Sequence, residues 1–529
     1  MGLDGATFDL LKPLAASGLM PNFAELLAKS CCGILKSTQP PYTPPAWSSF
    51  YTGVNPGKHG IYGFTFFNPV TKRRELSNSR VMGSKKIWQI LNDHGISTGL
   101  INLPLTYPPE KVDGYMITGM MTPERSRNFT YPESLEGEIG SLETEYIVDV
   151  PVVPVNDSGN MHVLKPLRKS MEGRRAAYQH MLKHHPCDFV MMVFVTPDRL
   201  QHVYWKYLDE KCSLYDTRTG ELFRKEILQL YGMLDGIIGD IIAGLGNETN
   251  VFIISDHGFT ELRSEFIMNN WLKSEGFFNL ASAGKQMWMP GYKRLRSGRM
   301  VKFLSSGLGG RLRERGMNNL VDWGRSAAYS REQGLFINLV DRDKHGLIAQ
   351  GAEYENTVRE IADKLKRFIN PHDGIELVSS ISFKDELYHG DFAWVAPDLV
   401  PVLDDYRCYV HDGILRKTLV EDRSEDPHGA HHADGIFMAY GPNIGIGGVE
   451  NARIIDAAPT ILYSMGLPVP QHMDGKVLAG IFRHDFVSKN PVSGDAEDTS
   501  MRSAADDDVY SQEEADAIEE QLRGMGYLS

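Results

Sequence analysis

The sequence predicts an α/β protein whose mostly parallel central sheet lies between helical layers, with an inserted cap region. Two near-continuous apolar runs, 188–195 and 250–255, are typical of strands buried on both faces. Between them, apolar residues recur at three- and four-residue spacing from Ile227 to Leu245, which indicates an amphipathic helix. A strand, a helix and a strand in this order form a parallel crossover unit. Similar strand-then-helix patterns elsewhere in the chain extend this interpretation to the whole fold.

The other elements follow from the same patterns, taken from the N-terminus. Residues 2–4 resemble the end of a buried strand, whose beginning we expect upstream. Amphipathic helices are predicted over three further segments, 86–94, 169–184 and 355–368. Residues 436–440 are predicted to resume a core strand. Asp456 then precedes a predicted helix through Leu462, and its carboxylate is a candidate N-cap.

Composition divides the chain into three regions. We expect residues 1–261 and 401–487 to form the core, and residues 262–400, which are Gly-rich and less regular, to form an inserted substrate-facing region. Residues 488–529 are predicted to be a largely disordered acidic tail, because they contain few apolar side chains. Within the tail, residues 517–528 are a candidate for a short terminal docking helix.

Charge and cysteine content exclude several classes of protein. The net charge is −13, and the tail supplies most of it, with eleven acidic residues and one basic residue between Asp495 and Glu520. The nearly neutral body gives no support to a nucleic-acid-coating role. Five scattered cysteines without a CxxC pair indicate neither a disulfide framework nor a thiolate metal site, so we expect a cytoplasmic protein. No apolar run approaches the roughly 18 residues of a membrane span, and the sequence leaves the oligomeric state open.

Metal-ligating residue types lie at the ends of the predicted strands. They are Asp4 after the first strand, Asp198 and His202 after the strand at 188–195, Asp256 and His257 after the strand at 250–255, and His431 before the strand at 436–440. Carboxyl ends of parallel strands meet at one edge of a sheet, where ligands bind. Each motif alone is weak, since an Asp-x-x-x-His pair is more often a surface pair. Together, oxygen and nitrogen ligands without thiolates suit zinc or manganese.

These motifs, with the segments 43–53 (TPPAWSSFYTG) and 56–61 (PGKHGI), resemble the alkaline phosphatase superfamily in its type I phosphodiesterase/nucleotide pyrophosphatase branch. The resemblance extends from Gly2 to about Leu478. It implies an alkaline-phosphatase-like fold and a nucleophilic threonine, here Thr43. It also implies two divalent metal ions, zinc or, as the alternative, manganese. One ion would be bound by Asp4, Asp256, His257 and the Thr43 oxygen, and the other by Asp198, His202 and His431.

The chemistry of the residues agrees with that scheme. A threonine hydroxyl is a poor nucleophile near neutral pH and needs a base or a metal ion to activate it. The sequence therefore predicts a two-metal phosphoester hydrolase, most consistent with a phosphodiesterase, that acts on a small-molecule phosphate ester through a phospho-threonine intermediate. Two alternatives stay open: a phosphomutase of the same superfamily, and a non-catalytic binding protein that retains the fold.

Two features depart from the scheme or extend it. Relatives that cleave nucleotide diesters carry a phosphate-binding asparagine 21 residues after the nucleophile, where this chain has Phe64; Asn78 and Asn102 are candidate substitutes. Basic residues also cluster between Lys293 and Arg315. This cluster fits an anion-binding lid or, equally, a solvated surface segment.

Overall fold

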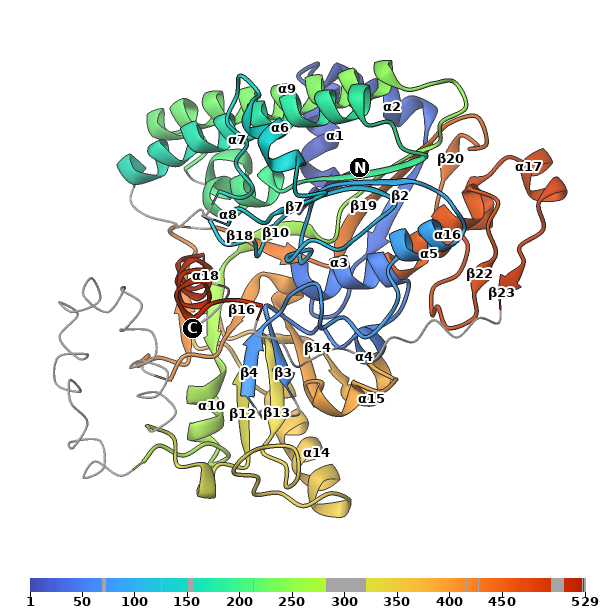
Figure 1. Ribbon diagram of the computed structural model, residues 1–529. Helices are drawn as coiled ribbons and strands as arrows, with labels where there is room; N and C mark the ends of the chain where they lie inside the picture. Colours follow the sequence, from blue (N-terminus) through green and yellow to red (C-terminus); the bar gives the residue numbers. More distant parts are fainter. Residues whose placement is uncertain are drawn as a thin grey trace.

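The computed structural model describes the chain except for residues 69–72, 125, 151–156, 213, 282–319, 415, 427, 496–508, 526 and 528–529. Its centre is a large mixed sheet with helices on both faces (Figure 1). The strands in spatial order are β20 (Gly447–Gly448), β2 (Cys31–Lys36), β19 (Asp434–Tyr440), β9 (Val251–Ile254), β1 (Gly2–Leu3), β8 (Phe189–Phe194), β5 (Thr98–Leu103), β6 (Gly114–Thr118) and β7 (Thr130–Tyr131). A further strand, β21 (Ala452–Arg453), also pairs with β2.

Strand direction in this sheet confirms the predicted fold class. β1 runs parallel to both β8 and β9, and β5 runs parallel to β8 and β6. The exceptions are β19, which is antiparallel to β2 and β9, and β7 at the opposite edge. The carboxyl ends of β9, β1 and β8 therefore lie side by side. This arrangement positions the residues that directly follow each of these three strands.

Two hydrophobic cores cover the two faces of the sheet. Along β8, Met192 and Phe194 pack into one core while Met191 and Val193 pack into the other, as expected for a strand buried on both faces. Helices with side chains in the first core include α1 (Phe8–Ala16), α2 (Pro21–Lys29), α6 (Leu135–Gly140), α7 (Asp157–His184), α8 (Thr196–Leu208) and α9 (Arg218–Gly244). The second core includes side chains from α3 (Thr43–Thr52), α5 (Ile87–Asp93) and α16 (Ala457–Ser464), and the short α4 (Pro56–His59) follows α3.

One described helix, α9, is long and apolar enough to cross a membrane, with a mean hydropathy of 1.3 in its most apolar window. In the structure α9 contacts α2, α7 and α8, and 44% of that window is buried. Core helices of globular domains have the same properties, so the composition of α9 is weak evidence for a membrane span.

The predicted elements are present, with shifted boundaries. α7 and α9 begin well before the predicted starts, because their first turns carry few apolar residues and gave no periodic signal. Asp456 does stand at the N-cap of α16, but its side chain makes no capping bond there. Its carboxylate instead accepts hydrogen bonds from the backbone N–H groups of Arg453 and Lys476. The predicted capping role of this side chain is therefore wrong for α16, and the carboxylate joins two loops.

Smaller sheets lie below the carboxyl edge of the central sheet (Figure 1). One has the order β12 (Ala328–Arg331), β13 (Gly334–Ile337), β15 (Leu399–Leu403) and β14 (Val378–Phe383). Another has the order β16 (Cys408–His411), β11 (Ser264–Ile267) and β17 (Val420–Asp422). α10 (Met268–Ser274) and α14 (Ala352–Lys366) pack with them in a third hydrophobic core, and α15 (Lys384–Leu387) follows β14. The basic cluster at 293–315 lies outside the described residues.

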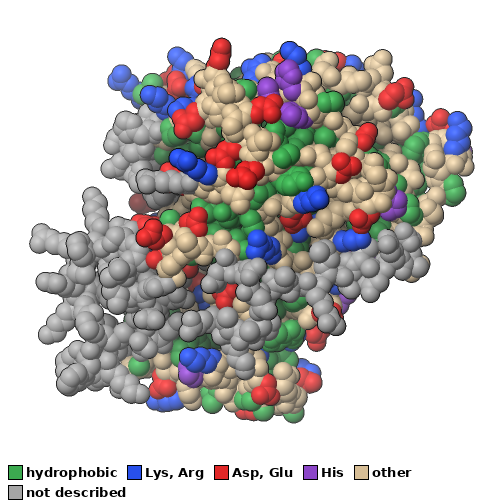
Figure 2. All heavy atoms as spheres, in the orientation of Figure 1, with side chains coloured by type: hydrophobic (Ala, Val, Ile, Leu, Met, Phe, Trp, Pro, Cys, Tyr) green, Lys and Arg blue, Asp and Glu red, His purple; other side chains and the backbone are tan. Residues whose placement is uncertain are grey.

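Two antiparallel two-stranded sheets and the C-terminal segment complete the described fold. The pairs are β3 (Thr65–Asn68) with β4 (Arg73–Leu76), and β10 (Gly258–Leu262) with β18 (His428–His432). The C-terminal part contains α17 (His484–Lys489), the pair β22 (Val469–Pro470) and β23 (Gly494–Asp495), and α18 (Gln512–Gly524). Ile518 and Leu522 of α18 are buried in the second core. Figure 2 shows acidic and basic side chains interspersed over the described part of one face.

Asp474 joins three segments that are distant in sequence. Its carboxylate accepts hydrogen bonds from the Asn55 backbone, from Lys58 Nζ at 2.6 Å and from His389 Nε2 at 3.0 Å. Burial alone would raise the pKa of Asp474, but the bonds from Lys58 and Asn55 outweigh it and lower the pKa to about 2. A carboxyl with a depressed pKa stabilises the fold above its unfolded pKa of about 3.9, and that contribution is lost as pH falls towards 2.

We predict that Asp474→Asn lowers the free energy of unfolding by about 1–3 kcal/mol at pH 7, because it removes charge-assisted hydrogen bonds. Urea denaturation would measure this loss, with Asp485→Asn on the exposed face of α17 as the matched control. The difference between wild type and Asp474→Asn should shrink as the pH is lowered from 4 to 2. Equal losses in both variants would contradict the anchoring role.

Candidate metal centre

The first ligand group lies where β1 and β9 end. Asp4 directly follows β1, and Asp256 and His257 follow β9. All three side chains are fully buried, and one ligand atom from each lies within 4.8 Å of the others. His257 Nε2 is 3.3 Å from Asp256 Oδ2 and 3.8 Å from Asp4 Oδ1. Those two carboxylate oxygens have no hydrogen-bond donor among the described residues.

Each residue of this group has a second polar atom, not aimed at the other two residues, that is held by a hydrogen bond to the surrounding protein. Trp47 Nε1 donates to Asp4 Oδ2 at 3.0 Å, and the Gly5 backbone N–H donates to Asp256 Oδ1 at 3.1 Å. His257 Nδ1 lies 3.1 Å from the Gly258 carbonyl oxygen, which holds the proton on Nδ1 and leaves the Nε2 lone pair free. Outer bonds of this kind orient metal ligands.

The second group comes from α8 and β18. Asp198 and His202 are one turn apart on α8, and His431 lies on β18. Asp198 Oδ1 is 3.3 Å from the Nε2 atom of each histidine, and the two Nε2 atoms are 2.8 Å apart. Asp198 Oδ1 also lacks a hydrogen-bond donor in the described structure.

Arg199 holds the second group in place. This buried guanidinium donates to Asp198 Oδ2 at 2.8 Å and to Asp149 Oδ2 at 3.0 Å. His431 Nδ1 lies 3.0 Å from the Pro41 carbonyl oxygen, so its Nε2 also faces inward with a free lone pair. Arg199 was not among the residues predicted from the sequence, although it is adjacent to Asp198, because arginine is not a metal ligand. Its bond to the distant Asp149 could be found only in the structure.

The two groups are adjacent, and Thr43 lies beside them. The rings of His257 and His431 stack with centroids 3.6 Å apart. Thr43 is the first residue of α3, is fully buried, and has its Oγ1 3.3 Å from His257 Nε2. All seven residues singled out in the sequence are thus brought together, in the two groups expected. Gly5 permits this approach: its φ is +67°, and a Cβ there would lie 2.6 Å from the Phe259 ring.

The charges of the two groups fit a divalent cation. Burial raises the pKa of Asp4 and of Asp256 well above the usual range, and neighbouring carboxylates raise both further. Burial also opposes ionisation of Asp198, but His202, His431 and Arg199 outweigh it and hold its pKa well below the usual range. Burial lowers the pKa of His257 and His431, which favours the neutral, ligating imidazole. Unpaired buried oxygens beside neutral imidazoles are the donor set of a metal site.

A third cluster lacks these properties. Glu138 of α6 lies beside His180 and His185, at the end of α7, and the three are partly exposed. One carboxylate oxygen, Glu138 Oε1, contacts both imidazoles, at 2.5 and 2.8 Å. Hydrogen bonds from these histidines lower the pKa of Glu138, so protein donors already stabilise its carboxylate.

The position of the expected phosphate-binding asparagine offers no polar side chain. Phe64 is fully buried and packs edge-on against Tyr42, with ring centroids 5.2 Å apart. The two candidate substitutes are engaged elsewhere. Asn78 bonds to the backbone of Leu76 and Arg80, and the amide of Asn102 lies 3.3 Å from the Tyr146 hydroxyl.

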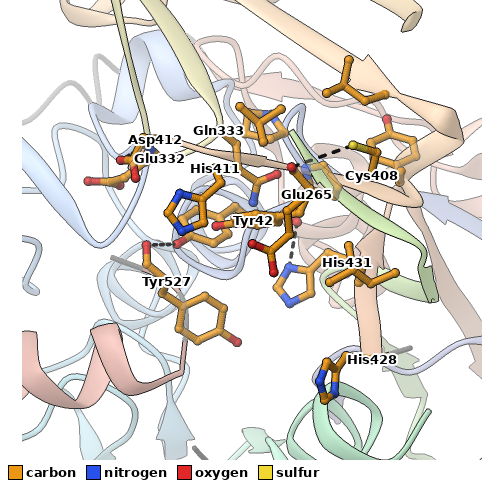
Figure 3. Close-up of a pocket in the computed structure, with 18 of the residues that line it drawn as sticks. Tyr42, Glu265, Glu332, Gln333, Cys408, His411, Asp412, His428, His431 and Tyr527 are labelled. Carbon is orange, nitrogen blue, oxygen red and sulfur yellow. Dashed lines mark hydrogen bonds between the residues drawn. The ribbon is translucent and has the colours of Figure 1, made fainter. Parts of the chain in front are cut away.

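A cavity of about 690 Å³ leads from the second ligand group to the smaller sheets (Figure 3). His202, His431 and Tyr42 are among the residues that line it. Strands β15 and β16 contribute to its wall, together with C-terminal residues Arg523 to Met525 and Tyr527. A substrate group of moderate size therefore has space beside the candidate metal centre.

Comparison with known proteins gives a family and a fold. A family model described as type I phosphodiesterase / nucleotide pyrophosphatase matches residues 1–434. Solved structures of ectonucleotide pyrophosphatase/phosphodiesterase 5 from mouse (an inactive variant in complex with AMP) and human are similar: each has 14% identity, a TM-score of 0.50, and coverage of 91% of this chain and 98% of that chain. At this identity the likeness shows the fold alone, and it confirms the alkaline-phosphatase-like architecture expected from the sequence.

A shorter match links the chain to mutases. The 2,3-bisphosphoglycerate-independent phosphoglycerate mutase 2 of Methanosarcina barkeri is 37% identical over 60 residues, which are 11% of this chain and 11% of that protein. The chain therefore spans about a tenth of the length of this curated relative.

We predict that chelation lowers the melting temperature of the protein and that added zinc or manganese restores it, because the buried carboxylates lose a compensating cation. When the free metal concentration is 100 times the Kd of a site, metal binding at that site stabilises the fold by about 2.7 kcal/mol. Differential scanning fluorimetry measures the shift. Asp256→Asn should remove much of it, whereas Glu138→Gln at the third cluster should keep it. A shift that is absent, or that depends on Glu138, would contradict the assignment of the two groups.

Proposed function

This chain belongs to the type I phosphodiesterase / nucleotide pyrophosphatase family, and from that premise we propose that it is a two-metal phosphodiesterase acting through Thr43. Membership makes it a phosphoesterase of the alkaline phosphatase superfamily. The finer proposal depends on one observation: the Thr43 hydroxyl lies 3.3 Å from His257 Nε2, beside two ligand groups whose buried carboxylate oxygens are unpaired.

Asp4, Asp256 and His257, with the Thr43 oxygen, would hold one divalent ion, and Asp198, His202 and His431 the other. The donor set suits zinc or manganese. Bound there, the ions would supply the positive charge that activates a hydroxyl and stabilises the oxygens of an in-line displacement.

The protein's own residues have defined parts in this proposal. Thr43 Oγ1 loses its proton and attacks phosphorus, the bond to the leaving alcohol breaks, and that alcohol departs with the proton, which leaves Thr43 esterified to a phosphoryl group that still carries the second alcohol. Water then attacks phosphorus, the Thr43–phosphorus bond breaks, and the hydroxyl is regenerated. Trp47 and Arg199 fix the carboxylates of Asp4 and Asp198 through these steps, because each donates to the outer oxygen of its partner.

A phosphomutase is the second candidate, and the 60-residue match to phosphoglycerate mutases favours it. In that case phospho-Thr43 would transfer its group to a second hydroxyl of the substrate instead of to water. A non-catalytic binding protein is the third, and the complete set of seven site residues argues against it.

We predict that Thr43→Ala lowers kcat for an aryl phosphodiester by at least a thousandfold in the presence of zinc or manganese, because the nucleophile is lost. Thr52→Ala is the matched control: Thr52 is equally buried in α3, but its hydroxyl donates to the Ser48 carbonyl oxygen. This variant should keep its activity. Parallel assays with aryl monoesters identify the preferred ester.

Activity that survives Thr43→Ala would exclude the covalent mechanism. Transfer of the phosphoryl group to an added sugar or hydroxy-acid acceptor, without release of phosphate, would favour the mutase.

A further inference from the structure

The C-terminal tail reaches the candidate metal centre. Ser511 caps α18 through a capping box with Glu514, and the buried Ile518 and Leu522 anchor the helix to the second core. Beyond the helix, Tyr527 is buried, and its backbone oxygen accepts a hydrogen bond from the Tyr42 hydroxyl at 2.9 Å. The tail is therefore docked on both sides of α18, and Tyr527 lies beside the second ligand group.

The Tyr527 side chain points into the second ligand group. Its hydroxyl is 3.0 Å from His202 Nε2, 3.3 Å from Asp198 Oδ2 and 3.4 Å from Arg199 Nη1. The centroid of its ring lies 4.8 Å from the centroid of the Phe64 ring. Figure 3 shows the ring entering the cavity from the side of the C-terminal helix, opposite His431.

This placement supplies a hydroxyl where Phe64 supplies no polar group. Phe64 supports the Tyr527 ring, so the aromatic residue and the tail tyrosine form one unit. We propose that Tyr527 is a substrate-contacting residue whose hydroxyl donates a hydrogen bond to a phosphoryl oxygen beside the Asp198, His202 and His431 group. The proposal rests on the proposed function of the site as a phosphoesterase centre.

Tyr527 has one phenolic proton, and in this structure its hydroxyl donates that proton to Asp198 Oδ2 over 3.3 Å. Arg199 Nη1 donates to the hydroxyl oxygen, so the phenol O–H itself must point elsewhere. His202 Nε2 is a metal ligand in the proposed function and has no second lone pair to accept that proton. Asp198 Oδ2 already accepts from Arg199 Nη1 at 2.8 Å, and its 3.3 Å distance to the phenol is longer. A phosphoryl oxygen is likewise an anionic acceptor, and a shorter bond to it would replace this long, shared bond to Asp198.

The tail also shapes the substrate pocket. Arg523, Gly524 and Met525 line the same cavity as Tyr527. The chain end thus contributes both a polar contact near phosphorus and part of the wall that faces the remainder of the substrate.

Binding of inorganic phosphate to the zinc-loaded full-length protein tests this role by titration calorimetry. Tyr527→Phe keeps the ring that packs on Phe64 and removes only the hydroxyl. We expect phosphate affinity to fall roughly tenfold or more, because a hydrogen bond to a charged group is lost. Bound zinc and melting temperature should stay at wild-type values.

Tyr510→Phe is the matched control. Tyr510 is a buried tyrosine of the same tail, and its hydroxyl donates to the carbonyl oxygens of Ser77 and Met121. This variant should bind phosphate as the wild type does, and steady-state kinetics should place the Tyr527→Phe defect in kcat/KM for the ester.

Wild-type affinity in Tyr527→Phe, or tighter binding, would overturn the proposal; tighter binding would mean that the tail obstructs the site. An equal loss in Tyr510→Phe would also overturn it, because the effect would then be one of tail docking. If the wild-type protein bound two zinc ions but no phosphate and cleaved no ester, the proposed function would fail and this proposal with it.

Discussion

The structure is organised around three buried carboxylates that share a small volume without enough positive charge between them. Asp4, Asp198 and Asp256 reach it because β1, β8 and β9 are parallel neighbours and end at the same edge. Each carboxylate uses one oxygen to bond a protein donor and leaves the other unpaired. Burying such charges is costly unless a cation compensates them. Trp47 and Arg199 therefore bond the outer oxygens of these carboxylates. The carbonyl oxygens of Gly258 and Pro41 hold Nδ1 of His257 and His431, so that each Nε2 faces the site.

Much of the fold was predictable because buried parallel strands have a simple composition. The runs at β8 and β9 are apolar on both faces, and the helix between them has a clear period. Elements that are short or weakly amphipathic were harder to predict. β1 has only two residues, and the first turns of α7 and α9 lack apolar periodicity. α18 docks through a few apolar side chains in an acidic segment: composition indicated disorder for most of the tail, and the short docking helix expected at 517–528 begins earlier, at Gln512.

In the candidate site, the ligands could be predicted from the sequence, but the groups that orient them could not. The ligands were identifiable because Asp and His at strand ends have a distinctive chemistry and because Thr43 begins a recognisable segment. The groups that orient them were not identifiable, since their partners are remote in sequence: Arg199 joins Asp149, and Trp47 joins Asp4. Tyr527 is the extreme case, because it lies 325 residues from His202, and no local pattern links the two. Phe64 was visible as a departure, but the aromatic unit that it forms with Tyr527 required the structure.

The central claim, that two groups of three protein ligands each hold a divalent ion beside Thr43, is tested most directly by diffraction at the zinc absorption edge. Crystals of the zinc-loaded protein should give two anomalous peaks roughly 3.5–4 Å apart. One peak should lie among Asp4, Asp256 and His257, and the other among Asp198, His202 and His431. A single peak, or zinc bound only at Glu138, His180 and His185, would contradict the account.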